Sequence, residues 1–221
     1  METVPLREMR FKQINRIFFA LYLLFSAVLI AVYACQRDVY HLAISLGTPL
    51  IFPALWLFYK IFHFRRVHQL DFLIVAFTFL AYPLGSCLDL YRMLPGFDKL
   101  AHCLSGVFVS LLCLILYYAL KPGHRIERKD AGLAMAFMFF GSMAVAGLWE
   151  IGEYILSAIV KIDLQRVLTT SVSDSMLDMI VCLIGTVATL PFVKRLCDGR
   201  RGLITGAVEA FVEINLKEGN K

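Results

Sequence analysis

The chain has 221 residues, of which 59% are hydrophobic and 18% are charged. A soluble domain of this length keeps much of its surface in water, so this composition excludes an ordinary soluble domain and favours a membrane protein. The formal net charge of +5 is modest, and the basic residues gather between apolar segments. This distribution is typical of membrane topology and does not indicate nucleic-acid binding.

Six apolar segments are long enough to cross about 30 Å of hydrocarbon. They cover about residues 17–36, 41–62, 70–91, 98–120, 130–159 and 174–193. Pro49 and Pro53 are expected to kink the second segment, and Pro83 with Gly85 to break the third. We therefore predict an all-α polytopic protein in which residues 1–199 form one six-helix transmembrane bundle.

Residues 200–221 are predicted to form a cytoplasmic tail with an amphipathic helix over 203–216. Its apolar residues fall on one stripe: Leu203, Ile204, Ala207, Val208, Phe211, Val212 and Leu216. A helix that lies on a membrane surface usually has a Lys/Arg-rich polar face, which this helix lacks. We expect the stripe to pack on the chain itself, or to bind a partner or a second copy of the chain.

The basic residues alternate in density from loop to loop, which predicts the orientation. The richer segments are the N-terminus, the second and fourth loops and the C-terminal flank, with Arg7, Arg10, Lys12, Arg16, Lys60, Arg65, Arg66, Lys121, Arg125, Arg128, Lys129, Lys194, Arg195, Arg200 and Arg201. The other loops hold only Arg37, Arg92, Lys99, Lys161 and Arg166. The positive-inside rule therefore predicts that both termini are cytoplasmic.

The fifth segment ends in Leu148-Trp149-Glu150-Ile151-Gly152-Glu153-Tyr154, with two carboxylates three residues apart. Carboxylates beside hydrocarbon are costly unless they have a partner, a proton or a metal ion. At 1.5 Å per helical residue, Glu150 lies about 30 Å from the cytoplasmic end of its segment. The same rise per residue puts Asp98 and Asp174 at the extracytoplasmic ends of the fourth and sixth segments. Asp89 lies at the extracytoplasmic end of the third segment.

Each of these three segments adds a second polar residue on the same helical face. The full set is Asp98, His102, Glu150, Glu153, Asp174 and Asp178. Carboxylates suit Mg²⁺, Mn²⁺ or Ca²⁺, and a histidine also admits Zn²⁺ or Fe²⁺. We predict that these six residues are ligands of a divalent metal or acid/base groups. If the protein is an enzyme, Glu150, His102 and Asp178 are the expected catalytic residues. Small residues along the fifth segment favour it as the centre of the bundle.

Structural roles compete with this interpretation. Asp98 and Asp174 are suited to cap the helices that they begin, and a single histidine is more often a hydrogen-bonded core residue than a ligand. Capping does not account for His102, Glu153 or Asp178. One shared site explains all three pairs together.

The motifs Phe97-Asp98-Lys99-Leu100-x-His102-x3-Gly106, Glu150-x2-Glu153 and Asp174-x3-Asp178 with Gly185 resemble the YjdF-like family of uncharacterised bacterial inner-membrane proteins. The resemblance covers the third to sixth segments. It implies a multi-pass inner-membrane protein with these acids and the histidine grouped, and it assigns no activity. Cys182 stands where the pattern would have a polar residue.

Three functions agree with these features. The first is a metal-dependent hydrolase or transferase that acts on a membrane lipid or lipid-linked substrate at the extracytoplasmic leaflet. The second is an ion- or proton-coupled transporter, for which polar residues should continue toward the cytoplasmic side. The third is a structural or partner-binding protein that uses residues 203–216.

Overall fold

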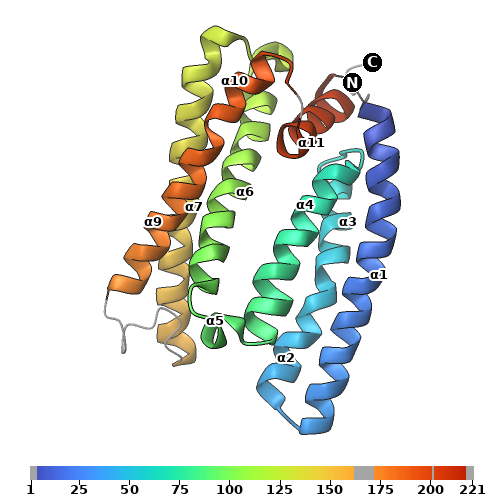
Figure 1. Ribbon diagram of the computed structural model, residues 1–221, viewed down its shortest axis with the longest axis vertical. Coiled ribbons are helices and arrows are strands. Elements are labelled where there is room, and N and C mark those ends of the chain that lie inside the picture. Colours follow the sequence, from blue (N-terminus) through green and yellow to red (C-terminus); the bar gives the residue numbers. More distant parts are fainter. Residues whose placement is uncertain (1–3, 162–171, 201, 218–221) are drawn as a thin grey trace. The chain divides into compact units, whose positions relative to one another are not determined.

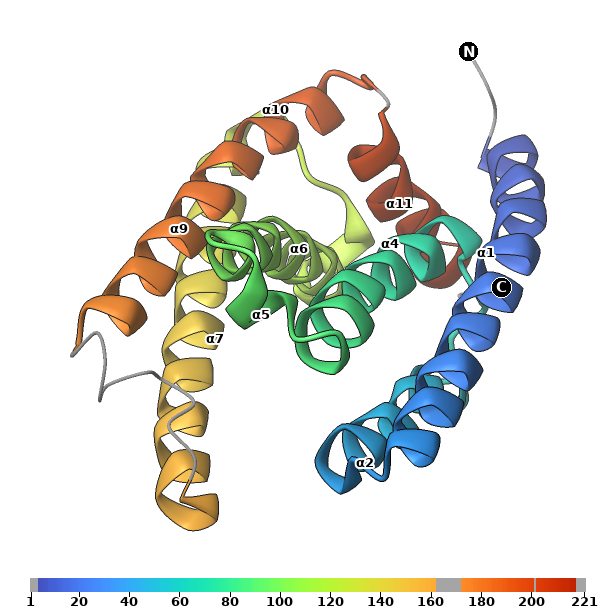
Figure 2. The same ribbon diagram turned by 60° about the horizontal axis from the view of Figure 1, so that its bottom comes forward.

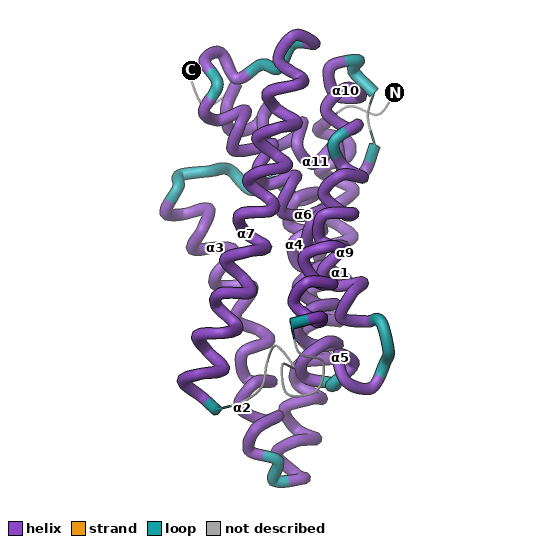
Figure 3. Tube along the Cα trace, turned by 90° about the vertical axis from the view of Figure 1, so that its left-hand side faces the viewer, coloured by secondary structure: helices purple, strands orange, loops and turns teal. Residues whose placement is uncertain are grey.

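The computed structural model describes residues 4–161, 172–200 and 202–217. Six of its helices are long and apolar enough to cross a membrane: Val4–Gln36, Val39–Ile61, His68–Cys87, Phe97–Leu120, Arg128–Val160 and Ser173–Cys197. Helices and loops account for this part of the chain, with no strand in it (Figure 3). The all-α, six-span fold is therefore confirmed. Arg166 and Arg201, used in the loop count above, lie outside the described residues.

The helices group into two compact units. Unit 1 comprises the chain up to Phe97 together with the residues from Gly206 onward, and unit 2 runs from Asp98 to Thr205. Unit 1 contains α1 (Val4–Gln36), α2 (Val39–Gly47), η1 (Thr48–Leu50), α3 (Ile51–Ile61), α4 (His68–Phe79), η2 (Leu80–Cys87) and α5 (Leu90–Met93). Unit 2 contains α6 (Phe97–Leu120), η3 (Pro122–His124), η4 (Arg128–Asp130), α7 (Ala131–Val160), α9 (Ser173–Thr189) and α10 (Pro191–Cys197).

Helix α1 is longer than the predicted span, because it continues through the basic N-terminal segment. Pro5 lies in its first turn, where a missing N–H costs nothing, and the Arg, Lys, Glu and Gln residues that follow are good helix formers. The predicted kinks are present as a 3₁₀ turn over Thr48–Leu50 and a π-helix over Leu80–Cys87. Both are local ways to accommodate a proline inside a helix.

The core of unit 1 is aromatic. Tyr22, Leu55, Tyr59 and Val75 are buried together, with phenylalanines of α1, α3 and α4 packed around them. The Tyr22 hydroxyl donates to the Thr48 carbonyl at 3.1 Å, so the kinked second span is tied to α1 at its break.

The tail helix packs on its own unit. It consists of α11 (Leu203–Phe211) followed by a π-helical stretch, Val212–Lys217, and from Gly206 onward it lies beside α1 and α4 (Figure 2). Phe211 meets Phe64 edge to face at 5.1 Å, and Glu209 accepts from Arg7 at 3.1 Å. The apolar residues Ala207, Val208, Ala210, Phe211 and Val212 are buried. Most of the predicted stripe is therefore covered by the chain itself.

Unit 2 is built on α6, α7 and α9, which pack against one another (Figure 1). A Cβ on Gly106 would collide with the Cys182 backbone, and one on Gly185 with the Cys103 backbone, so α6 and α9 cross at backbone contact. Buried hydroxyl pairs lie along these helices, with Ser142 and Thr186 2.7 Å apart and Ser110 and Thr189 2.6 Å apart.

Within unit 2, the fifth segment does not lie at a centre, contrary to the expectation from its small residues, because one face of α7 is exposed. Leu133, Phe140 and Leu148 of α7 are each more than 60% exposed, and a Cβ on Gly132 or Gly147 would meet nothing within 4 Å. Its small residues therefore serve close packing only in part, as at Gly141, where a Cβ would meet the Cys113 side chain.

Candidate metal centre

The site residues lie at one end of unit 2, where α6 and α9 begin. Gly96, with φ of 83°, makes the turn into α6, and Asp98 occupies the first turn of that helix. Asp174 occupies the first turn of α9, whose N-cap is Val172. The capping alternative for Asp174 is therefore not borne out, since Val172 holds the N-cap position and Asp174 is a residue of the first turn. Both acids still benefit from the positive end of the helix dipole.

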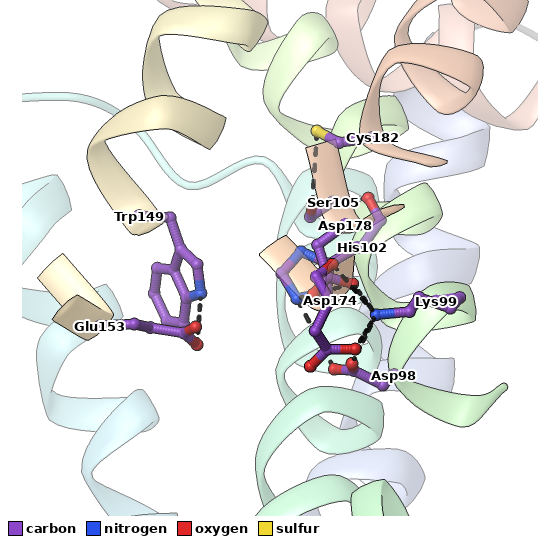
Figure 4. A network of polar contacts seen from close by, with 9 residues as sticks. All are labelled: Asp98, Lys99, His102, Ser105, Trp149, Glu153, Asp174, Asp178 and Cys182. Atoms are coloured by element: carbon purple, nitrogen blue, oxygen red, sulfur yellow. Dashed lines mark hydrogen bonds and ion pairs between the residues drawn. The ribbon is translucent and has the colours of Figure 1, made fainter. Parts of the chain in front are cut away.

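Lys99 lies among the aspartates. Its Nζ is 2.7 Å from Asp174 Oδ1, 2.7 Å from Asp178 Oδ1 and 3.3 Å from Asp98 Oδ2. It also donates to the Asp174 carbonyl at 3.4 Å. Figure 4 shows these side chains around the amine. One residue of α6 thus links Asp174 and Asp178 of α9, and the aspartates have a cationic partner within the chain itself.

His102 faces two of the same carboxylates from one turn further along α6. Its Nε2 is 3.6 Å from Asp98 Oδ1 and 3.8 Å from Asp178 Oδ1. One ligand atom from each of these three residues lies within 4.8 Å of the other two. In the part of the chain that the structure describes, Asp98, His102 and Asp178 form a group of possible ligands close enough together to hold one metal ion.

These spacings fit the ligands of one cation. The two His102 distances exceed the 2.7–3.2 Å range of an N–H···O hydrogen bond. Two ligands of a tetrahedral ion with bonds of about 2.1 Å are about 3.4 Å apart, and neighbouring ligands of Ca²⁺ at about 2.4 Å have nearly the same separation. The two His102 distances are therefore within a few tenths of an ångström of such ligand separations, and the third side of the triangle, between Asp98 and Asp178, is no longer than 4.8 Å. A protonated His102 paired with both carboxylates is the structural alternative.

The two glutamates of α7 lie outside this triangle. Glu153 accepts a hydrogen bond from the Trp149 indole at 2.9 Å, apart from the Lys99 network (Figure 4). Its carboxylate is still close enough to Glu150, Asp98 and Asp178 for charge repulsion. Glu150 is buried, at 9% exposure, so it does not lie in open water.

Of the six predicted ligands, Asp98, His102 and Asp178 come together as one candidate ligand set. Asp174 joins them through Lys99, and Glu150 and Glu153 are not part of this set. Asp89 belongs to unit 1, where it pairs with Arg92 at 3.7 Å. The structure thus brings three of the six predicted ligands together in unit 2, and metal binding by the six residues stays a prediction.

Residues 15–199 match the family model described as predicted membrane protein (DUF2238). The chain belongs to this family. The match agrees with the resemblance to YjdF-like uncharacterised membrane proteins and extends it over the first two spans. No curated protein and no solved structure matches the chain.

Lys99 is the site residue that sequence reasoning missed in this member of the DUF2238 family. Its position beside a predicted span favours a loop charge, whereas the structure places it in the first turn of α6. Its partners in α9 are 75 and 79 residues away, so no local spacing predicts the contact. The available signal was the motif itself, in which Lys99 stands between Asp98 and His102.

Proposed function

We propose that this membrane protein binds a divalent cation through Asp98, His102 and Asp178. The observation that carries the proposal is the triangle of their ligand atoms within 4.8 Å of one another. A carboxylate–imidazole set of this kind suits Mn²⁺, Zn²⁺ or Fe²⁺, and the carboxylates also suit Mg²⁺ or Ca²⁺.

Charge balance supports a divalent ion. With their ordinary charges, Asp98, Asp174 and Asp178 carry three negative charges, and Lys99 among them contributes one positive charge. Uncompensated charge beside hydrocarbon is expensive. One divalent cation would neutralise the net negative charge that remains on these four side chains.

The proposed activity is a metal-dependent hydrolysis or transfer on a lipid or lipid-linked substrate. A bound cation would polarise a phosphoester or acyl oxygen or activate water. Among this chain's own residues, Asp98, His102 and Asp178 would hold that ion. Glu153 and Glu150 on α7 supply carboxylates beside it, suited to accept or return a proton.

The proposed location is the extracytoplasmic side of a bacterial inner membrane. The opposite end of unit 2 carries the basic residues Lys121, Arg128 and Lys194, and two of them pair there with Asp130 and Asp198. Both described ends of the chain lie at one end of unit 1, where Arg7 meets Glu209. An even number of spans and the positive-inside rule then favour cytoplasmic termini.

Metal binding by the purified protein tests the proposal. We expect the protein in nanodiscs to bind Mn²⁺, read by electron paramagnetic resonance, and the variants His102→Ala and Asp178→Asn to lose that binding. Asp198→Asn is the matched control, because it removes an acid from the other end of unit 2. Wild-type protein without bound Mn²⁺, Zn²⁺, Ca²⁺ or Mg²⁺ by calorimetry would refute the metal site.

Activity requires a separate measurement. Lipid extracts incubated with the wild-type protein and with Asp178→Asn should differ in one headgroup class by mass spectrometry. Identical lipid profiles together with confirmed metal binding would refute the enzymatic part of the proposal and leave the cation site.

Transport is the second candidate, because buried hydroxyl pairs lie beyond the site in unit 2. Ser142 with Thr186 and Ser110 with Thr189 continue polar groups from the site toward the other end of unit 2. A proton or cation flux into liposomes that Ser110→Ala or Thr186→Val abolishes, with Mn²⁺ binding unchanged, would support transport over lipid chemistry.

A further inference from the structure

One carboxylate oxygen serves two neighbours in the candidate metal centre. Asp178 Oδ1 is 2.7 Å from Lys99 Nζ and 3.8 Å from His102 Nε2. The same atom is the Asp178 oxygen paired with His102 Nε2, so we assign it as the Asp178 ligand of the ion. An ion and the lysine amine would therefore act on a single atom.

Lys99 has a second, independent anchor. Asp174 accepts from the amine through Oδ1 at 2.7 Å and through its carbonyl at 3.4 Å, and Asp174 is not part of the ligand triangle. An ammonium group has three N–H donors. If an ion binds Asp178 Oδ1, the Lys99 amine still donates to Asp174, and the N–H that it had donated to Asp178 becomes available for another acceptor.

We infer that a divalent cation and Lys99 compete for Asp178 Oδ1, and that cation binding turns Lys99 from a counter-ion into the binding group for a phosphate borne by the substrate. This inference rests on the proposed function, because it needs the cation site. It adds the regulation of that site and the chemical class of its substrate.

Electrostatics gives the direction of the competition. A cation within bonding distance of Asp178 Oδ1 would stand only a few ångströms from the ammonium group, where like charges repel. The lysine stem is flexible, and its side chain is 26% exposed, against 7% for Asp178. The amine is therefore the group that yields, while the buried carboxylate stays in place.

The arrangement after this shift selects an oxyanion. A divalent ion and an ammonium group side by side are the pair of positive groups that proteins aim at a phosphoryl group. The carboxylates Asp98, Asp174 and Asp178 would repel an anion without the cation. Cation and phosphate binding should therefore reinforce each other.

Mn²⁺ titration in phosphatidylcholine nanodiscs tests the competition. We compare the wild-type protein with Lys99→Met, which keeps length without charge, and Lys99→Arg, which keeps the charge. Lys99→Met should bind Mn²⁺ roughly tenfold more tightly than wild type, as for contacting groups that interact by about 1.4 kcal/mol. Lys99→Arg should remain within a few-fold of wild type. Equal Mn²⁺ affinity in wild type and Lys99→Met would overturn the inference.

The anion-binding step is tested by adding phosphate from two sources. Inorganic phosphate is added to the buffer in one arm, and phosphatidate replaces part of the lipid in the other, with protein-free discs subtracted. Phosphate from at least one source should tighten Mn²⁺ binding to wild type and Lys99→Arg and leave Lys99→Met unchanged, since linkage is reciprocal. An effect limited to phosphatidate identifies a lipid headgroup, and an effect of the buffer arm identifies a soluble phosphate. No effect in either arm overturns this step.

The two levels of failure are distinguishable. Absence of Mn²⁺ binding in wild type and in Lys99→Met refutes the proposed function itself. Mn²⁺ binding in both at equal strength refutes the role of Lys99 alone. Should Lys99→Met fail to fold, the wild-type and Lys99→Arg responses to phosphate still decide the anion-binding step.

Discussion

The close crossing of α6 and α9 can be tested by adding a single methyl group. A Cβ on Gly185 would overlap the Cys103 carbonyl oxygen, and would lie 2.9 Å from the Cys103 carbonyl carbon and 3.2 Å from the Val107 nitrogen. These are backbone atoms, so no side-chain rotation relieves the overlap. Overpacking costs about 1–3 kcal/mol, and we expect Gly185→Ala to lie near the upper value.

The same change should also weaken cation binding. Asp98 and His102 come from α6 and Asp178 from α9, so forcing the two helices apart enlarges the ligand triangle. The matched control is Gly147→Ala, because a Cβ there meets nothing within 4 Å. In a helix interior that control should stabilise the protein by about 0.5–1 kcal/mol.

Thermal unfolding in nanodiscs and Mn²⁺ binding are the two measurements. Gly185→Ala should melt several degrees below wild type, and Gly147→Ala at or above it. A Gly185→Ala protein with wild-type melting temperature would show that α6 and α9 are not in backbone contact. The positions assigned to Asp98, His102 and Asp178, which depend on that contact, would then be wrong as well.

Three further predictions concern unit 1. Asp71 is fully buried and accepts hydrogen bonds from Tyr59 and Arg66. Asp71→Ala should lower the free energy of unfolding in urea by about 1–3 kcal/mol, because the buried Tyr59 hydroxyl loses its acceptor; a loss below about 1 kcal/mol would contradict the network. Asn215 bonds the Arg65 backbone at 2.6 and 3.0 Å, so Asn215→Ala should speed proteolysis of the tail, and an unchanged cleavage rate would show that this contact does not hold it. The backbone N–H of His41 lowers the pKa of Asp38 below 3.8; the stabilising effect of this cap is therefore full above pH 3.8 and is lost as pH falls through the lowered pKa, so the melting temperatures of wild type and Asp38→Ala should converge in acid.

The spans followed from apolar run length, because hydrocarbon thickness is a constraint that each segment satisfies alone. The ends of helices were less predictable. Val4 rather than residue 17 begins α1, since polar helix formers extend a helix beyond the membrane without any apolar signal. For a similar reason, the sequence could not decide what covers the apolar stripe of the tail helix. Phe211 indicates that the stripe packs against another surface, and only the fold shows that this surface includes Phe64.

The sequence could predict which residues of the site come together, but it could not predict which of them form ion pairs. Helix periodicity put Asp98 with His102 and Asp174 with Asp178, and a common depth brought the two pairs together. Their partner Lys99 was missed because topology rules treat a lysine near a helix end as a loop charge. Whether Lys99 points toward water or toward α9 depends on the contact at Gly106 and Gly185, which is a property of two helices and not of either sequence segment.

Cys182 bears on the choice between a one-sided site and a path through unit 2. It lies in α9 between Asp178 and Thr186, and its thiol is 3.9 Å from the Ser105 hydroxyl. A thiol is a weak hydrogen-bond donor and acceptor, and the hydroxyls beyond it already bond to carbonyls such as those of Gly106 and Thr186. Such bonds hold helices together and do not by themselves carry protons. The polar groups are therefore strongly connected at the Lys99 end and weakly connected at Cys182, which favours chemistry at one end of unit 2 over passage along it.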